Sequence, residues 1–205
     1  TAVTGSGSDP ASGTPQAWVE VHGAGGLDQA RWVMASDGSL SLDYIYTLNG
    51  PYLYHGISFA YPLDTVTSVR ALIDGPSPVW QNRTEGTRLG VHEIAANDGS
   101  TVPKPDRAGY FANLRWARLE SAGEAWTVSA TTPQFLRLGT RLNDHQNTTV
   151  AFPAGDLSFL NAIPAIGSKF ISPEDSGPSG LPAMAAGTYS GRLTFAWTQS
   201  AEQGH

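Results

Sequence analysis

The chain has 205 residues and a formal net charge of −6 at pH 7, and only 15% of its residues are charged. An acidic chain lacks the basic surface that nucleic-acid phosphates require, so we exclude nucleic acid as a partner. The sequence contains no cysteine, which excludes disulfides, thiolate metal sites and a cysteine nucleophile. No apolar run approaches the roughly 18 residues that span a bilayer, and we therefore expect no membrane partner. We expect a periplasmic or secreted location, with which the missing cysteines are compatible.

The 23 glycines and 14 prolines indicate many turns. A chain rich in turn residues and aromatic residues is typical of an all-β fold made of many short strands. Residues 1–15 are mostly small and polar, so we predict a flexible linker there. We predict a single β-sandwich domain over residues 16–199 and a disordered tail over residues 200–205.

The best-defined strand covers residues 40–48. Leu40, Leu42, Tyr44, Tyr46 and Leu48 recur at every second position, and this period places them on one face of a sheet. Further strands are predicted at 16–22, 30–35, 56–61, 67–73, 87–95, 110–120, 125–130, 134–138 and 189–197. Residues 156–163 fit either one helical turn or a strand, and residues 172–182 form a long loop. Gly-containing turn signals separate the strands, so the sequence predicts an antiparallel β-sandwich of two packed sheets with little helix.

Residues 74–93 concentrate the chemistry that recognises sugars. An aromatic ring covers the apolar C–H face of a sugar, while amide and guanidinium groups bind its hydroxyls in fixed directions. The candidate carbohydrate-binding residues in this motif are Trp80, Asn82, Arg83, Glu85 and His92. Period-two strands bury most of the six tryptophans, but Trp80 follows Pro76 and Pro78 near a turn, so it is the tryptophan that we single out as a candidate to face a ligand or a neighbouring domain.

Catalysis is a weaker interpretation of the same motif. His92 and Glu93 have the side chains of an acid/base pair, but adjacent strand residues point to opposite faces of a sheet. Glycoside hydrolysis needs two carboxylates that flank the bond. Glu85, Glu93 and Glu120 are available, as are Asp98 and Asp106, yet no spacing singles out a pair. We therefore predict no catalytic residue in this chain.

Metal binding is disfavoured as well. The five histidines are scattered, without the spacing of a metal site. Asn97, Asp98 and Asp144 carry oxygen atoms that could bind calcium, but Asn97-Asp98-Gly99 is more simply an ordinary turn. We expect no metal and no cofactor.

The motif also carries a family resemblance. Residues 69–92 contain Gly75-Pro76, then Asn82-Arg83, then Leu89-Gly90, and three later segments follow in order at 109–118, 155–170 and 177–178. Together they resemble the C-terminal domain of glycoside hydrolase family 2 enzymes, the β-galactosidase-like proteins. The resemblance covers roughly residues 50–197 and implies a galactose-mutarotase-like β-sandwich.

The resemblance also implies a division of labour. In that family the catalytic carboxylates belong to a central (β/α)8 barrel, which this chain is too short to contain. A late loop of the domain lines the sugar pocket in the better-known β-galactosidases. The corresponding stretch is 167–180, which adds Ser168 and Lys169 to the candidate carbohydrate-binding residues. The implied partners are a catalytic barrel of the same parent chain and an oligosaccharide or polysaccharide that contains galactose.

Three functions remain open. The first is an ancillary domain of a glycoside hydrolase that supports or shapes the sugar site of the barrel. The second is a free-standing carbohydrate-binding module, and the third is a self-sufficient mutarotase or polysaccharide lyase fragment.

Overall fold

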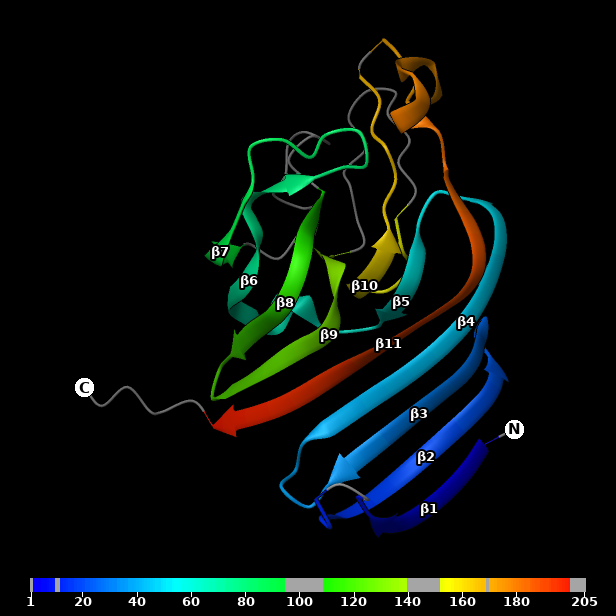
Figure 1. Ribbon diagram of the computed structural model, residues 1–205. Coiled ribbons are helices and arrows are strands. Elements are labelled where there is room, and N and C mark those ends of the chain that lie inside the picture. Colours follow the sequence, from blue (N-terminus) through cyan, green and yellow to red (C-terminus); the bar gives the residue numbers. More distant parts are fainter. Residues whose placement is uncertain (1, 10–11, 95–108, 140–151, 169, 200–205) are drawn as a thin grey trace, which may run out of the picture.

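The structure is a computed structural model that describes residues 2–9, 12–94, 109–139, 152–168 and 170–199 (Figure 1). Strands dominate it. They are β1 (Ala2–Ser8), β2 (Pro15–Ala24), β3 (Leu27–Ala35), β4 (Leu40–Tyr52), β5 (His55–Phe59), β6 (Val66–Val79), β7 (Arg88–Ile94), β8 (Tyr110–Ser121), β9 (Glu124–Leu138), β10 (Leu157–Ala162) and β11 (Ala183–Gln199). Short 3-10 turns lie at η1 (Leu63–Thr65), η3 (Glu174–Ser176) and η4 (Pro178–Gly180). No helix among these residues has the length and apolar character of a membrane span.

All strand pairs are antiparallel, which confirms the predicted all-β class. The strands form one hydrogen-bonded sheet in the order β1-β2-β3-β4-β11-β9-β8-β6-β7, and β10 joins β5 to β9 as a branch. In Figure 1 this sheet curves strongly, so that β5 and β10 lie in a second layer over the concave side.

The two packed layers are connected through β9, because this strand contributes to both. The first half of β9 pairs with β11, from Glu124 opposite Gln199 to Ala130 opposite Leu193. Its last four residues pair with β10 instead. Pro133 lies between the two halves, where proline is tolerated because no ladder hydrogen bond needs its missing N–H. The long strand thus passes from one layer to the other.

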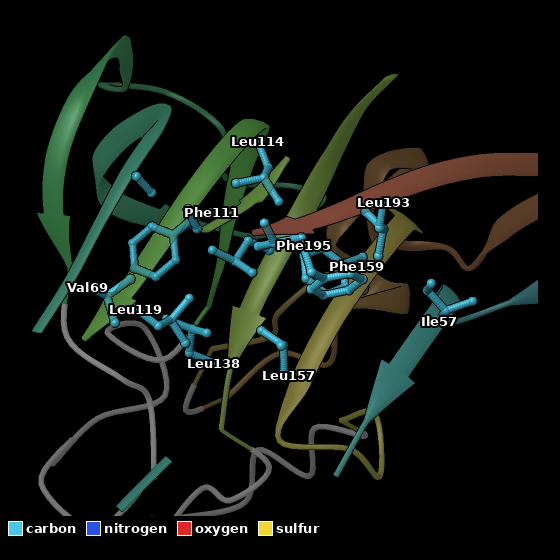
Figure 2. Close-up of a cluster of buried hydrophobic side chains, with 14 of the residues drawn as sticks. Ile57, Val69, Phe111, Leu114, Leu119, Leu138, Leu157, Phe159, Leu193 and Phe195 are labelled. Carbon is cyan, nitrogen blue, oxygen red and sulfur yellow. The ribbon is translucent and has the colours of Figure 1, made fainter. Parts of the chain in front are cut away.

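The core fills the space between the layers, and Figure 2 shows its aliphatic and aromatic side chains converging there. Leu42, Tyr44 and Tyr46 are each at most 3% exposed, so the period-two face predicted for residues 40–48 is confirmed. The Phe59 ring of β5, in the layer formed with β10, lies 6.2 Å from the Phe195 ring of β11, in the long curved sheet. Ring centroids at this separation are in direct packing contact.

The first residues of the chain differ from the predicted linker. β1 pairs over all seven of its residues with β2, from Ala2 opposite Val21 to Ser8 opposite Pro15. Backbone pairing needs no large side chain, and Gly5 leaves room for the Trp18 ring, because a Cβ there would lie 2.6 Å from Trp18 Cε2. Arg31 covers Trp18 at 4.5 Å. Composition suggested a linker, but small residues also suit an edge strand that an aromatic ring covers.

Within residues 156–163, where the sequence left helix and strand open, Leu157–Ala162 form the strand β10. Leu157, Ser158, Phe159 and Leu160 are all buried. A strand covered on both faces has no apolar alternation, which explains why its pattern did not identify it. The predicted tail at 200–205 lies outside the described residues.

Candidate functional site

Trp80, the ring predicted to stack on a sugar, is only 1% exposed. It packs in a small second core, with ring centroids 5.5 Å from Tyr110 and 5.8 Å from Phe152. A buried indole cannot present its face to a ligand, so the prediction for Trp80 is wrong. The prolines before it lie in β6, and this strand directs the ring inward.

The polar residues after Trp80 bind another part of the same chain. The Asn82 side chain donates from Nδ2 to the Ile166 carbonyl and accepts from the Ile166 N–H, both at 2.9 Å. Gln81 donates from Nε2 to the carbonyls of Ser179 at 3.1 Å and Leu181 at 2.8 Å. Arg83 lies 3.5 Å from the Gly167 carbonyl. We call these three side chains the latch, because they hold the segment 164–181.

The remaining predicted residues do not gather around one site. Glu85 is exposed in the turn between β6 and β7. His92 Nε2 lies 3.1 Å from the Arg88 carbonyl oxygen, and its ring fills the space beside Gly75 and Gly90, where a Cβ would lie 2.8 Å and 3.1 Å from it. Ser168 Oγ accepts hydrogen bonds from the N–H groups of residues 170 and 171. Lys169, like Asn97, Asp98, Asp106 and Asp144, lies outside the described residues.

A groove lined by aromatic side chains lies near the C-terminal end of β11. It was not singled out by any pattern in the sequence. Its cavity volume is about 240 Å³. The lining comprises Trp32, Leu40, Phe59, Ala60, Tyr61, Trp126, Leu157, Phe195 and Trp197. Trp197 is 52% exposed and Trp126 is 8% exposed, so an accessible tryptophan and a nearly buried one both line the groove. We call this set the aromatic groove.

Strand register explains why these rings meet. Trp197 lies directly opposite Trp126, and Phe195 lies two residues earlier on the same face of β11. The Phe195 centroid is 5.9 Å from Trp126, 5.8 Å from Trp32 and 6.4 Å from Trp197. One aromatic surface is therefore assembled from three strands that are distant in sequence.

The polar chemistry of the groove centres on Tyr61. Trp126 donates its indole N–H to the Tyr61 hydroxyl at 2.7 Å. The backbone N–H of Tyr61 donates to Asp156 Oδ2 at 3.4 Å, which places a carboxylate beside the groove. None of the nine lining residues carries a charge. The groove therefore offers rings and a hydroxyl, without a charged group in its walls.

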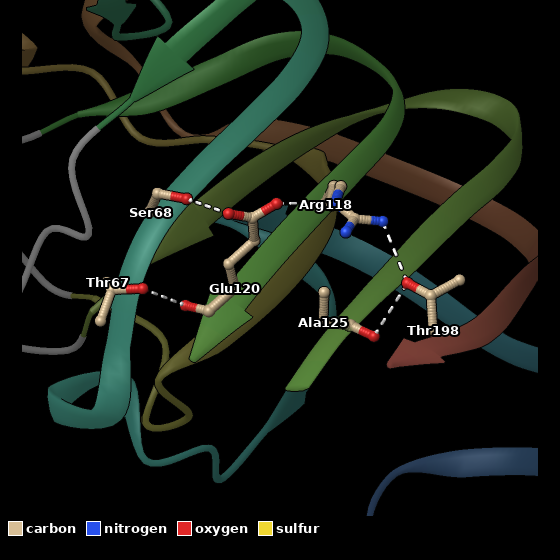
Figure 3. Close-up of polar contacts among 6 residues, drawn as sticks. All are labelled: Thr67, Ser68, Arg118, Glu120, Ala125 and Thr198. Atoms are coloured by element: carbon tan, nitrogen blue, oxygen red, sulfur yellow. Dashed lines mark hydrogen bonds and ion pairs between the residues drawn. The ribbon is translucent and has the colours of Figure 1, made fainter. Parts of the chain in front are cut away.

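A polar network holds strands together on the side of the sheet that faces away from the core (Figure 3). Arg118 donates from Nε to Glu120 at 2.8 Å and from Nη1 to Thr198 at 3.0 Å. Ser68 donates to the second Glu120 oxygen at 3.0 Å. These bonds, those from Arg118 foremost, hold the pKa of Glu120 below its usual range. A carboxylate stabilised in this way is poorly suited to be the acid of a hydrolase.

A buried histidine forms a second polar cluster between the layers. Tyr46 donates its hydroxyl to Asn161 Oδ1 at 2.8 Å and lies 3.0 Å from His55 Nδ1. Because the tyrosine proton is directed to Asn161, His55 Nδ1 donates to the tyrosine oxygen. Burial lowers the pKa of His55. Among the described residues, no three His, Cys, Asp or Glu side chains lie close enough together to hold a metal ion.

The comparisons with known proteins give a likeness among solved structures. No family model and no curated protein matches the chain. Among solved structures, the chain is similar to a galactose 1-epimerase from Lactobacillus acidophilus NCFM, with 12% sequence identity and a TM-score of 0.46. The similarity covers 98% of this chain and 67% of that protein. It is a likeness in strand arrangement, and no residue of a sugar site is carried over from it.

Proposed function

We propose that this chain is a carbohydrate-binding β-domain and that the aromatic groove is its binding surface. The observation that carries the proposal is the exposed Trp197 ring, which lines one groove with Trp126 and Phe195. Aromatic rings bind the apolar C–H faces of sugars, and the Tyr61 hydroxyl supplies a hydrogen bond to a sugar hydroxyl. The groove is smaller than the roughly 300–1,000 Å³ pockets that enclose a drug-sized molecule. It therefore suits a short stretch of a sugar chain.

We further propose that the domain acts as an ancillary part of a β-galactosidase-like glycoside hydrolase. Its partner would be a catalytic barrel, and its ligand a galactose-containing oligosaccharide. The segment held by the latch supports this, because several large apolar side chains are exposed on and just after it. Phe170 is 86% exposed, Ile171 51%, Leu181 49% and Met184 74%. Exposed apolar residues gathered in one segment are typical of a surface that another domain covers.

The alternative is a free-standing carbohydrate-binding module, which would use the same groove without a barrel. The residues encoded before Thr1 discriminate between the two functions. A barrel sequence there supports the ancillary domain, whereas a parent protein of about this chain's size supports the module.

Titration with galactose-containing oligosaccharides, followed by calorimetry, tests the binding function. Trp197→Ala should weaken binding by about tenfold or more, because a central aromatic contact commonly contributes over 1 kcal/mol. Trp18→Ala is the matched control, since this ring lies in the N-terminal hairpin outside the groove. The binding function is rejected if the unaltered chain shows no saturable binding. An equal loss in both variants would show that the groove is not the site.

A further inference from the structure

Resting on the proposed carbohydrate site, we infer that the aromatic groove selects neutral sugars and rejects acidic sugars of the same shape. The selectivity would come from the walls of the groove and from the charge beside it. Uronic acids and neutral sugars can share ring shape and linkage and differ only in a carboxylate. The groove is arranged to distinguish them by that one difference.

The walls contain no partner for an anion. All nine lining residues have uncharged side chains. A carboxylate that moves from water into such a groove loses hydration and gains no counter-charge, which is strongly unfavourable. The hydroxyls of a neutral sugar lose less, because single hydrogen bonds replace their hydration.

Tyr61 is the wall residue best placed to make such a bond. A tyrosine hydroxyl has one hydrogen to donate and two lone pairs. The Trp126 N–H occupies one lone pair at 2.7 Å. Among the described residues the Tyr61 hydroxyl has no second hydrogen-bond partner, so its own hydrogen is available to a ligand oxygen. One such hydrogen bond suits a hydroxyl and is insufficient for a desolvated carboxylate.

The charges around the groove act in the same direction. Asp156 lies at its edge, with Oδ2 3.4 Å from the Tyr61 N–H, and it immediately precedes the wall residue Leu157. A carboxylate at this edge adds no positive charge with which an anionic ligand could pair. Two of the chain's cations are engaged elsewhere, Arg31 with Glu20 at 3.4 Å and Arg118 with Glu120 at 2.8 Å. A third, Arg137, is fully buried.

The test compares three oligosaccharides of equal length and linkage by calorimetry: one of galactose, one of galacturonic acid, and the methyl ester of the latter. The galactose oligomer should bind at least about tenfold more tightly than the galacturonate oligomer, since an uncompensated charge outweighs one hydrogen bond. Methyl esterification removes the charge and should restore most of the affinity. Trp197→Ala should weaken every measurable binding event, which places the difference at the groove.

A designed cation provides the reciprocal test. Ala60 is an exposed wall residue, so Ala60→Lys adds a positive charge without removing a ring. It should tighten galacturonate binding at least severalfold and leave the neutral oligomer nearly unchanged. The double variant with Asp156→Asn keeps the new lysine from pairing with that aspartate, and it should tighten galacturonate binding as well. Ala186→Lys, an exposed position of β11 outside the groove, is the control and should change neither affinity.

The outcomes separate the two proposals. If neither oligomer binds, the carbohydrate function is overturned, and the selectivity with it. If both oligomers bind through Trp197 with equal affinity, or if galacturonate binds more tightly, the selectivity alone is overturned. Failure of the methyl ester to recover binding would show that charge is not the cause.

Discussion

Asn82 offers the sharpest test of the roles assigned to the motif at residues 74–93. Its side chain makes two hydrogen bonds with one backbone unit 84 residues away, both at 2.9 Å. Asn82→Ala leaves the N–H and the carbonyl of Ile166 without these partners, at a residue that is 2% exposed. Each buried polar group left unpaired costs about 1–3 kcal/mol. The expected loss is about 2–4 kcal/mol, a large part of the roughly 5–15 kcal/mol that stabilises a typical domain.

Urea unfolding measures this loss, and amide hydrogen exchange locates it. Exchange should accelerate at Ile166 and along the segment 164–181, where the bonds of the latch are broken. Arg83→Ala is a matched control from the same turn, because its contact with Gly167 is long at 3.5 Å. It should cost less than about 0.5 kcal/mol, the usual range for a surface substitution.

Sugar binding decides between the structural and the ligand role of Asn82. At temperatures where the variant remains folded, Asn82→Ala should bind galacto-oligosaccharides as the unaltered chain does, because Asn82 is not part of the aromatic groove. If the variant kept its stability but lost binding, the latch would be a sugar site and the reasoning above would be refuted.

Three further predictions concern stability. Gly56→Ala should cost at least about 2 kcal/mol more than Gly187→Ala in the free energy of unfolding, measured by chemical denaturation. Both glycines have a positive φ, 153° at Gly56 and 116° at Gly187. Only at Gly56 would an added Cβ collide with backbone atoms, those of Phe159 and Leu160. Arg137→Met should leave the melting temperature unchanged or raise it. Arg137 is a fully buried cation whose pKa is lowered to about 10 by burial, and its Nε and Nη2 have no hydrogen-bond partner in the described structure. A loss of more than about 2 kcal/mol in the free energy of unfolding would contradict this prediction. Burial also lowers the pKa of His55 below its usual 6.5. As the pH falls, His55 is therefore protonated at a higher pH in the unfolded chain than in the folded one. The contribution of His55 to the free energy of unfolding should be fully present above about pH 6.5 and should decrease as the pH falls below that value. His55→Gln should flatten that decline, and an unchanged pH profile would show that His55 does not cause it.

Local periodicity predicted the strands well where one face is buried and the other is not. The segment 40–48 is the clearest case, because its alternate residues are buried as expected. It failed at β10, whose two faces are both covered, and at β1, whose small residues carry no apolar signal. In each case the deciding contact is with a strand elsewhere in the sequence.

The candidate site was harder to predict for the same reason. The motif at 74–93 was recognised as a dense group of polar and aromatic residues, but local sequence does not reveal that Asn82 binds Ile166. The aromatic groove depends on Trp126 and Trp197 being opposite each other in neighbouring strands. The Phe195-x-Trp197 alternation near the end of a strand was the available signal. Only the register of the sheet gives it significance.

The position of β11 in the sheet has a consequence for how the protein is made. β4 is hydrogen-bonded to β11, and the Asp43–Arg192 ion pair between them joins residues 149 positions apart. At a synthesis rate of roughly 5–20 residues per second, the ribosome needs on the order of ten seconds to add that length of chain. During this interval one edge of β4 has no partner, and an unpaired edge is a template for association with other nascent chains. The interval between the synthesis of β4 and that of β11 therefore leaves the growing polypeptide open to association through this edge.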